Sequence, residues 1–341
     1  MAKPWEKIKI RTDSGEEKDA SAPLIISASR STDIPAFYSK WFMERLRRGY
    51  LAWTNPFNRE KQYVSFENTR LIVFWTKNPK PMMKYLEQLD DRGINYYFQF
   101  TLNDYEKENF EPNVPPLSRR IYTFQELSEL VGKDKVIWRY DPLILTNTVD
   151  IPVLIKRIER VGDELHNYTS KLVFSYADIN IYRKGMNNLR RESVSYSEFS
   201  HYKMLDFAEK LSVLNRKWNL ELATCCEEIG LEQLGIKHNK CIDGELIIKL
   251  FRNDSVLMDF LGYREPVQES LFDGAGSAKT PNLKDKGQRK ICGCIMSKDI
   301  GEYDTCSHLC VYCYANTSEK SVMEKARKHN YMNEGISYLF F

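Results

Sequence analysis

The chain has 341 residues, of which 42% are hydrophobic, and its formal net charge at pH 7 is +3. No apolar run approaches the roughly 18 residues that cross a bilayer. The start, Met1 to Ala20, is polar and charged, unlike a secretory signal. We therefore expect a cytoplasmic protein with one or two domains and no membrane association. The balanced charge neither requires nor excludes nucleic acid.

Short apolar runs alternate with helical spacing along the first two thirds of the chain. We expect residues 1–22 to form a flexible extension. Buried strands are predicted at residues 24–28, 71–75, 96–100, 136–140, 172–176 and 220–224. Helical periodicity lies between them at residues 41–48, 82–89, 118–131, 154–165 and 197–218.

Six strand-then-helix units in succession predict an α/β fold with a parallel sheet. We expect a partial (β/α) barrel over residues 23–270. A doubly wound sheet is the alternative, although no G-x-G-x-x-G loop supports a dinucleotide site. Residues 271–290 have the composition of a linker or loop. A C-terminal segment, residues 291–341, should complete the barrel and contain a helix at residues 319–328.

All eight cysteines lie between residues 225 and 313, a clustering that favours metal binding over disulfides in a reducing compartment. Cys306, Cys310 and Cys313 have C-x3-C-x2-C spacing. This spacing fits three thiolate ligands of a four-iron cluster and leaves the fourth iron without a protein ligand. Structural zinc is the alternative, although zinc sites more often have two separated C-x2-C pairs.

A second metal site is expected on four of the other cysteines. The predicted ligands are Cys225 (or its neighbour Cys226), Cys241, Cys292 and Cys294. An auxiliary iron–sulfur cluster and a zinc ion both suit this set. Ordinary buried thiols are the simpler alternative.

Polar residues follow the predicted strands, and ligands of parallel β/α folds bind outside the carboxyl ends of strands. The alternative is that these side chains pair with one another and stiffen the rim, because an isolated buried charge is costly. The residues are Arg30, Thr32, Asp33, Thr76, Lys77, Asn78, Gln99, Thr101, Arg139, Asp141, Ser175, Asp178, Thr224 and Glu227.

Residues 306–315, Cys-Ser-His-Leu-Cys-Val-Tyr-Cys-Tyr-Ala, resemble the cluster loop of radical S-adenosylmethionine (SAM) enzymes, in the branch related to spore photoproduct lyase. In that branch, similar strand-end motifs follow the cysteine loop, whereas here they precede it. The motifs are residues 32–33, 76–77, 111–112 and 139–142. The chain therefore resembles a circularly permuted radical SAM fold. Its terminal cysteines also resemble those of an uncharacterised bacterial family, a domain of unknown function.

This resemblance implies a [4Fe-4S] cluster on the cysteine loop, with SAM chelating the open iron and Tyr312 near the adenine. Asp33 would accept a hydrogen bond from the SAM amino group. Arg139 would face the SAM carboxylate, which suits a guanidinium fork. Further SAM contacts are expected from Thr32, Asp141 and Ser175. His308 either donates to a cluster sulfur or faces solvent.

The implied reaction is reductive cleavage of SAM to a deoxyadenosyl radical, which abstracts hydrogen from a substrate. The sequence identifies neither a catalytic residue nor the substrate, which is a small molecule, a peptide or a nucleic acid. A flavodoxin- or ferredoxin-type protein would donate the electron. The alternative function is a non-catalytic or electron-transfer metalloprotein with zinc or iron–sulfur sites.

Overall fold

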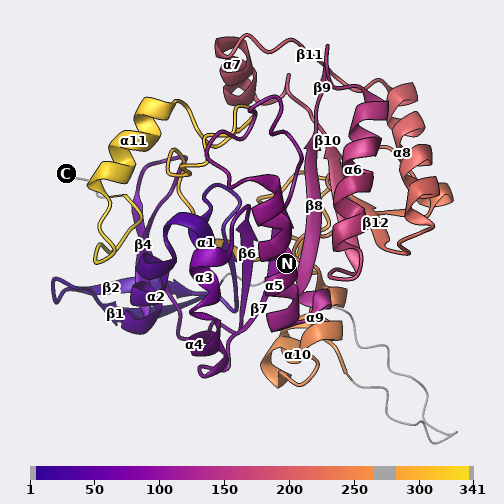
Figure 1. Cartoon of the computed structure of the whole chain (residues 1–341). Helices are drawn as coiled ribbons and strands as arrows, with labels where there is room; N and C mark the ends of the chain where they lie inside the picture. The colour runs from indigo at the N-terminus through magenta and orange to yellow at the C-terminus, as the bar shows by residue number, and fades with distance from the viewer. Residues whose placement is uncertain (1–4, 265–281, 338–341) are drawn as a thin grey trace, which may run out of the picture.

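The computed structural model describes residues 5–264 and 282–337 and is built around an eight-stranded parallel sheet (Figure 1). The strand order is β13-β12-β10-β8-β7-β6-β3-β14, and every neighbouring pair is parallel. The strands are β3 (Ile25–Ala28), β6 (Leu71–Thr76), β7 (Asn95–Thr101), β8 (Val136–Leu143), β10 (Lys171–Tyr176), β12 (Glu221–Thr224), β13 (Ile236–His238) and β14 (Lys298–Asp299).

Strand order follows chain order from β3 to β13, which excludes the doubly wound alternative. Such a sheet winds in one direction, and right-handed crossovers then place the connecting helices on one face. In the described residues β13 and β14 form no ladder with each other, so the barrel is not closed. The predicted α/β class and parallel sheet are confirmed.

Helices α5, α6 and α8 cover the outer face of the sheet (Figure 1). Every second strand residue points toward them, and Phe74 stacks on Phe98 with ring centroids 5.1 Å apart. The predicted helix at residues 82–89 is two short helices. The helices are α1 (Ile34–Phe37), α2 (Ser39–Arg48), α3 (Lys80–Met83), α4 (Leu86–Asp90), α5 (Leu117–Val131), α6 (Ile151–Leu165), α7 (Arg183–Arg191), α8 (His201–Asn215), α9 (Gly244–Phe251), α10 (Ser255–Leu261) and α11 (Glu319–Lys328).

The inner face of the sheet has its own core. Alternate strand residues, among them Val73, Tyr97 and Ile137, pack there with α9, α10 and five of the cysteines. Trp75, Gln99 and Arg139 follow Val73, Tyr97 and Ile137 by two positions. They lie on the same face of the sheet because strand side chains alternate with a period of two. The inner face is therefore apolar in its middle and polar toward its carboxyl edge.

The expected flexible extension at residues 1–22 is wrong for its described part. The hairpin of β1 (Glu6–Arg11) and β2 (Glu17–Ala22) joins β4 (Tyr50–Thr54) and β5 (Lys61–Ser65) in a second sheet. The hairpin is fixed because Ala20 and Ala22 are buried and because Asp13, in its turn, pairs with the fully buried Arg45 at 3.0 Å. The polar composition of the hairpin gave no sign in the sequence that one face of its second strand is buried. A further two-stranded ladder joins β9 (Leu145–Thr146) and β11 (Tyr196–Ser197).

The C-terminal segment returns to the first predicted strand. Lys298 and Asp299 of β14 pair in parallel with Ile26 and Ser27 of β3, and α11 forms where it was predicted. The predicted linker at residues 271–290 lies outside the described residues up to residue 281. Its described part turns back so that Lys284 bridges Ile295.

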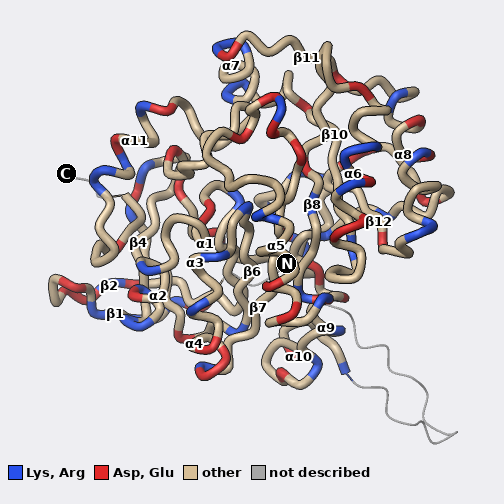
Figure 2. Tube along the Cα trace, viewed as in Figure 1, with Lys and Arg blue, Asp and Glu red and all other residues tan. Residues whose placement is uncertain are grey.

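Charged residues of both signs are interspersed over most elements, in line with the small net charge (Figure 2). In the part of the chain that the structure describes, no helix combines the length and the apolar character needed to cross a membrane.

Gly162 of α6 tests the packing of the outer helices. A Cβ atom at this position would lie 2.3 Å from the ring of Trp218. Ala ordinarily stabilises a helix relative to Gly by about 1 kcal/mol, but overpacking costs roughly 1–3 kcal/mol. We expect Gly162→Ala to lower the free energy of unfolding in urea denaturation. Glu164→Ala, on the exposed side of the same helix, is the control; equal stability of both variants would contradict the close approach of Trp218 to Gly162.

Candidate functional site

The loop with Cys306, Cys310 and Cys313 lies between β14 and α11, at the carboxyl edge of the sheet. Asn316 closes it by donating to the carbonyl of Cys306 at 2.8 Å. The buried Thr32, at the end of β3, exchanges hydrogen bonds with the backbone of Glu302 at 2.8 and 2.9 Å. The sequence placed Thr32 among the SAM contacts. The structure gives it a role in anchoring the start of the cysteine loop, and a contact with SAM stays a prediction.

Asp33 is a buried hydrogen-bond acceptor between β3, β6 and the cysteine loop. Its Oδ1 accepts from Thr76 Oγ1 at 2.8 Å and from the amide of Ala36, where it caps α1. Its Oδ2 accepts from the Lys77 amide at 2.7 Å and lies 2.7 Å from His308 Nε2. Both oxygens are thus engaged within the protein, and the contact with the SAM amino group stays a prediction.

His308 is buried, with 2% of its surface exposed, so the alternative that it faces solvent is wrong. Besides Asp33 it contacts the ring of Phe37, with centroids 4.6 Å apart. The carboxylate of Asp33 and this aromatic wall fix the imidazole inside the protein. His308 therefore attaches the cysteine loop to the end of β3.

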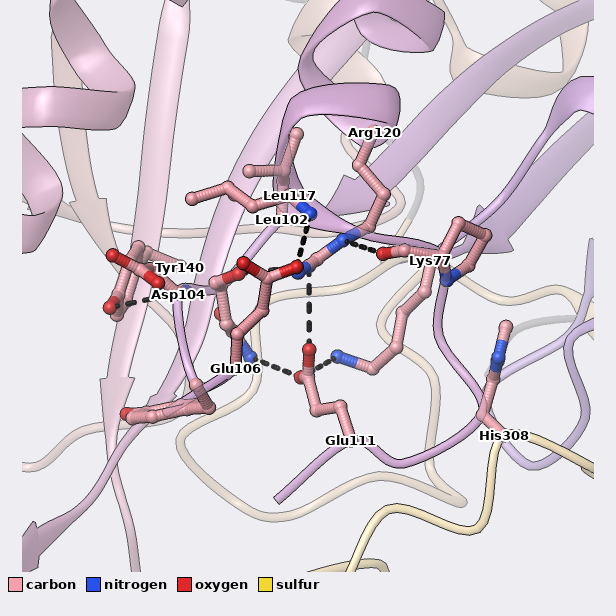
Figure 3. Close-up of polar contacts among 12 residues, drawn as sticks. Lys77, Leu102, Asp104, Glu106, Glu111, Leu117, Arg120, Tyr140 and His308 are labelled. Carbon is pink, nitrogen blue, oxygen red and sulfur yellow. Dashed lines mark hydrogen bonds and ion pairs between the residues drawn. The ribbon is translucent and has the colours of Figure 1, made fainter. Parts of the chain in front are cut away.

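Glu111 is a second buried acceptor beside the same loop, with Lys77 and Arg120 pointing at it (Figure 3). Its carboxylate accepts from Lys77 Nζ at 2.7 Å, from Asn103 Nδ2 at 3.0 Å and from Arg120 Nη1 at 3.4 Å, and also from the hydroxyl of Tyr312. Burial opposes ionisation of Glu111, but Lys77 and Arg120 outweigh it and hold the pKa below its ordinary value.

Tyr312, expected near the adenine, thus has its hydroxyl in the polar cluster around Glu111, within 3.0 Å of Lys77 Nζ. Contact of its ring with adenine stays a prediction. Sequence reasoning missed Asn103 and Arg120. Asn103 lies two residues past the end of β7, beyond the polar residues that directly follow the apolar run. Arg120 is in α5, and no local pattern marked it.

The other expected SAM contacts come together on the inner face. Asp141 accepts hydrogen bonds from both Arg139 and Ser175. Arg139 also donates to Gln99 Oε1 at 3.1 Å, and its guanidinium lies 5.2 Å from the ring centre of Trp75. These residues are bonded to one another, as in the alternative in which strand-end side chains pair and stiffen the rim. It contains both signs of charge, and a role in SAM binding stays a prediction.

The second cysteine set also converges, from three separate segments. Cys225 Sγ lies 3.4 Å from Cys241 Sγ, and Cys294 interacts with both Cys241 and Cys292. Cys226, which the sequence left as an alternative to Cys225, interacts with Cys292. All five cysteines are therefore neighbours beneath the polar layer of the inner face.

The thiols of the first loop are chemically suited to a cation that displaces their protons. Burial raises the pKa of Cys306 to about 12, and it also raises the pKa of Cys310 and Cys313. The positive charge of Lys77 opposes this effect, because it lowers the pKa of Cys310 and Cys313. A thiol is deprotonated when it binds a metal, so these thiolates would be stabilised by a bound cation and by this lysine.

In the described residues, no three His, Cys, Asp or Glu side chains are arranged to hold a metal ion. The spacing of Cys306, Cys310 and Cys313 along the loop is therefore the feature that suggests a metal group here.

Comparison with known proteins identifies a family. A family model described as "Domain of unknown function (DUF1848)" matches residues 25–315. The chain belongs to this family. The match extends from β3 through the cysteine loop, so the family domain includes the strand ends and all eight cysteines. No curated protein and no solved structure matches the chain. The expected membership of a family of unknown function is confirmed, and the radical SAM relationship stays a prediction.

Substitution of Glu111 tests the buried charge cluster. Glu111→Gln leaves Lys77 and Arg120 without their carboxylate, and removing one partner of a buried pair costs roughly 3–5 kcal/mol. We expect this loss in urea denaturation at pH 7. Because the pKa of Glu111 is lowered from 4.5, its contribution is present above pH 4.5 and disappears as the pH falls through the lower, folded-state pKa. The difference between wild type and variant should therefore shrink in acid.

The matched control is the more solvent-accessible pair of Lys80 and Glu126, whose side chains are 50% and 26% exposed and which are joined at 2.7 Å. Glu126→Gln should cost less than about 1 kcal/mol, because solvent screens exposed ion pairs. Equal effects of the two substitutions would show that Glu111 is not the buried acceptor described above.

Proposed function

We propose that this protein is a radical SAM enzyme, in which Cys306, Cys310 and Cys313 hold a [4Fe-4S] cluster with one open iron. The observation that carries the proposal is the position of the three thiols at the carboxyl edge of an open parallel sheet, directly after its edge strand β14. Ligands of parallel β/α folds bind at this edge. When bound, such a cluster supplies one electron to the SAM sulfonium, giving methionine and a deoxyadenosyl radical that removes hydrogen from the substrate.

The topology supports the proposed circular permutation. In the branch that the sequence resembles, the cysteine loop precedes the strand-end motifs. Here β14, the cysteine loop and α11 come last in the chain, yet β14 lies beside β3, where a first βα unit would lie. Permutation of this kind is tolerated when the original ends of a fold lie close together.

The side chains around the loop support its role in positioning a cofactor. Asp33 and Glu111 attach His308 and Tyr312 to the strand ends, and Lys77 contacts both carboxylates. Such buried, fully bonded networks keep the ligands of a site in fixed positions. Arg139, Asp141 and Ser175 are the groups that would bind the polar end of SAM.

The test is SAM cleavage by the full chain after anaerobic reconstitution with iron and sulfide and reduction with dithionite. We expect deoxyadenosine and methionine, measured by chromatography with mass spectrometry. Replacing any of Cys306, Cys310 or Cys313 with Ala should abolish both products. Ser307→Ala, in the same loop, is the control and should keep them. Iron-loaded protein that forms no deoxyadenosine would overturn the proposal and favour an electron-transfer or structural metalloprotein.

Tyr312 provides a separate test of SAM binding. Stacking of an aromatic side chain on a base contributes about 1–3 kcal/mol, and about 1.4 kcal/mol corresponds to a tenfold change in Kd. We expect Tyr312→Ala to weaken SAM binding about tenfold in anaerobic calorimetry. Tyr312→Phe, which keeps the ring, should have a much smaller effect. Both variants must match wild type in iron content; unchanged affinity in Tyr312→Ala would exclude the adenine contact.

A further inference from the structure

The five cysteines outside the loop are held against the inner face by the ends of three chain segments. Cys225 and Cys226 follow β12, Cys241 precedes α9, and Cys292 and Cys294 precede β14. The carbonyl of Cys241 accepts from Tyr97 Oη at 2.7 Å and from Gln99 Nε2 at 2.9 Å, and the amide of Ile242 lies 3.5 Å from Cys294 Sγ. The backbone on which these thiols stand is therefore fixed by bonds to β7 and to one another.

Hydrogen-bond donors and positive charge surround this thiol group. Arg139 Nη1 lies 3.2 Å from Cys241 Sγ, and Asn239 Nδ2 lies 3.1 Å from the same sulfur. Burial opposes the charge of Arg30, but Asp299 and then Cys294 and Cys241 hold the pKa of its guanidinium above the ordinary value. Only 3% of the Arg139 side chain and 18% of the Arg30 side chain are exposed. Buried cations require nearby negative charge. Asp141 supplies part of it to Arg139 and Asp299 supplies part of it to Arg30 at 3.9 Å, and thiolates would add to it.

Two buried donors of the inner face find no acceptor in the described part of the chain. Arg30 Nη2 and Trp75 Nε1 lack a hydrogen-bond partner among the described residues. The two side chains are adjacent, with the guanidinium 5.0 Å from the ring centre of Trp75, and Trp75 packs in the same inner core as the cysteines. An unsatisfied buried donor costs about 1–3 kcal/mol, so this pair indicates an acceptor-bearing group at this place.

We propose that Cys225, Cys241, Cys292 and Cys294 ligate a second iron–sulfur cluster, whose sulfides accept hydrogen bonds from Arg30 Nη2 and Trp75 Nε1. Zinc would satisfy the thiolates but would bring no additional acceptor, whereas a cluster carries inorganic sulfides. Cys226 stands beside the site as a thiol that is not a ligand. The inference uses none of the cysteines of the first loop, so it stands or fails separately from the proposed function.

The first test uses a variant that lacks the cysteines of the first loop, so that only the second set can bind metal. In the full chain with Cys306→Ala, Cys310→Ala and Cys313→Ala combined, we expect about four irons and four sulfides per chain after anaerobic reconstitution, as for a [4Fe-4S] cluster. Adding Cys225→Ala, Cys241→Ala, Cys292→Ala or Cys294→Ala should remove most of this iron. Adding Cys226→Ala is the matched control and should not. Zinc in place of iron, no metal, or equal loss with Cys226→Ala would overturn the assignment.

A second test leaves all ligands in place, so it does not depend on the folding of cysteine variants. Trp75→Phe removes one N–H donor while keeping an aromatic ring. Hydrogen bonds to cluster sulfurs help to set the reduction potential. We expect unchanged iron content and a more negative potential in a titration followed by electron paramagnetic resonance on the triple-alanine background. Trp218→Phe, on the outer side of the sheet, should leave the potential unchanged. An unaltered potential in Trp75→Phe would refute the donor assignment.

Discussion

The short parallel ladder between β14 and β3 is the constraint on which the arrangement of the site depends. It brings the end of the chain back to its first buried strand, although only two residue pairs form it. Side-chain bonds extend it: Asp299 Oδ2 accepts from Ser27 Oγ at 2.9 Å and from the amide of Arg30 at 3.0 Å. Gly301 permits the close approach that follows, because a Cβ there would lie 1.8 Å from Ser29 Oγ. The contact between β14 and β3 therefore positions the cysteine loop at the carboxyl edge of the sheet.

Two buried carboxylates then fix the loop against the strand ends. Asp33 and Glu111 lie on different segments, and Lys77 joins them by donating its amide to one and its ammonium group to the other. A buried carboxylate is tolerated because donors surround it, and the cost of losing a donor keeps the arrangement unique. Asp33, Lys77 and Glu111 therefore hold the cysteine loop in place through bonds within the protein.

Arg30 lies between the two cysteine groups. Its carbonyl accepts from the hydroxyl of Tyr314, next to Cys313, at 2.7 Å, while Asp299, Cys294 and Cys241 raise the pKa of its guanidinium. A single residue is thus hydrogen-bonded to the chain at one thiol group and linked electrostatically to the other. Two metal groups placed in this way would share one polar layer on the inner face, and substitutions in that layer would affect both.

The sequence by itself determined the elements in which local pattern and burial agree. Apolar runs such as residues 71–75 and 172–176 are strands because a strand covered on both faces must be apolar throughout, and the cysteine spacing defined one candidate site. It did not determine the hairpin at residues 6–22, whose polar strands are fixed by contacts with β5 and α2. Nor could it place β14, Arg120 or Trp75, since their partners are distant in the chain. Which buried donors find acceptors depends on how the segments pack, and only the tertiary structure decided that.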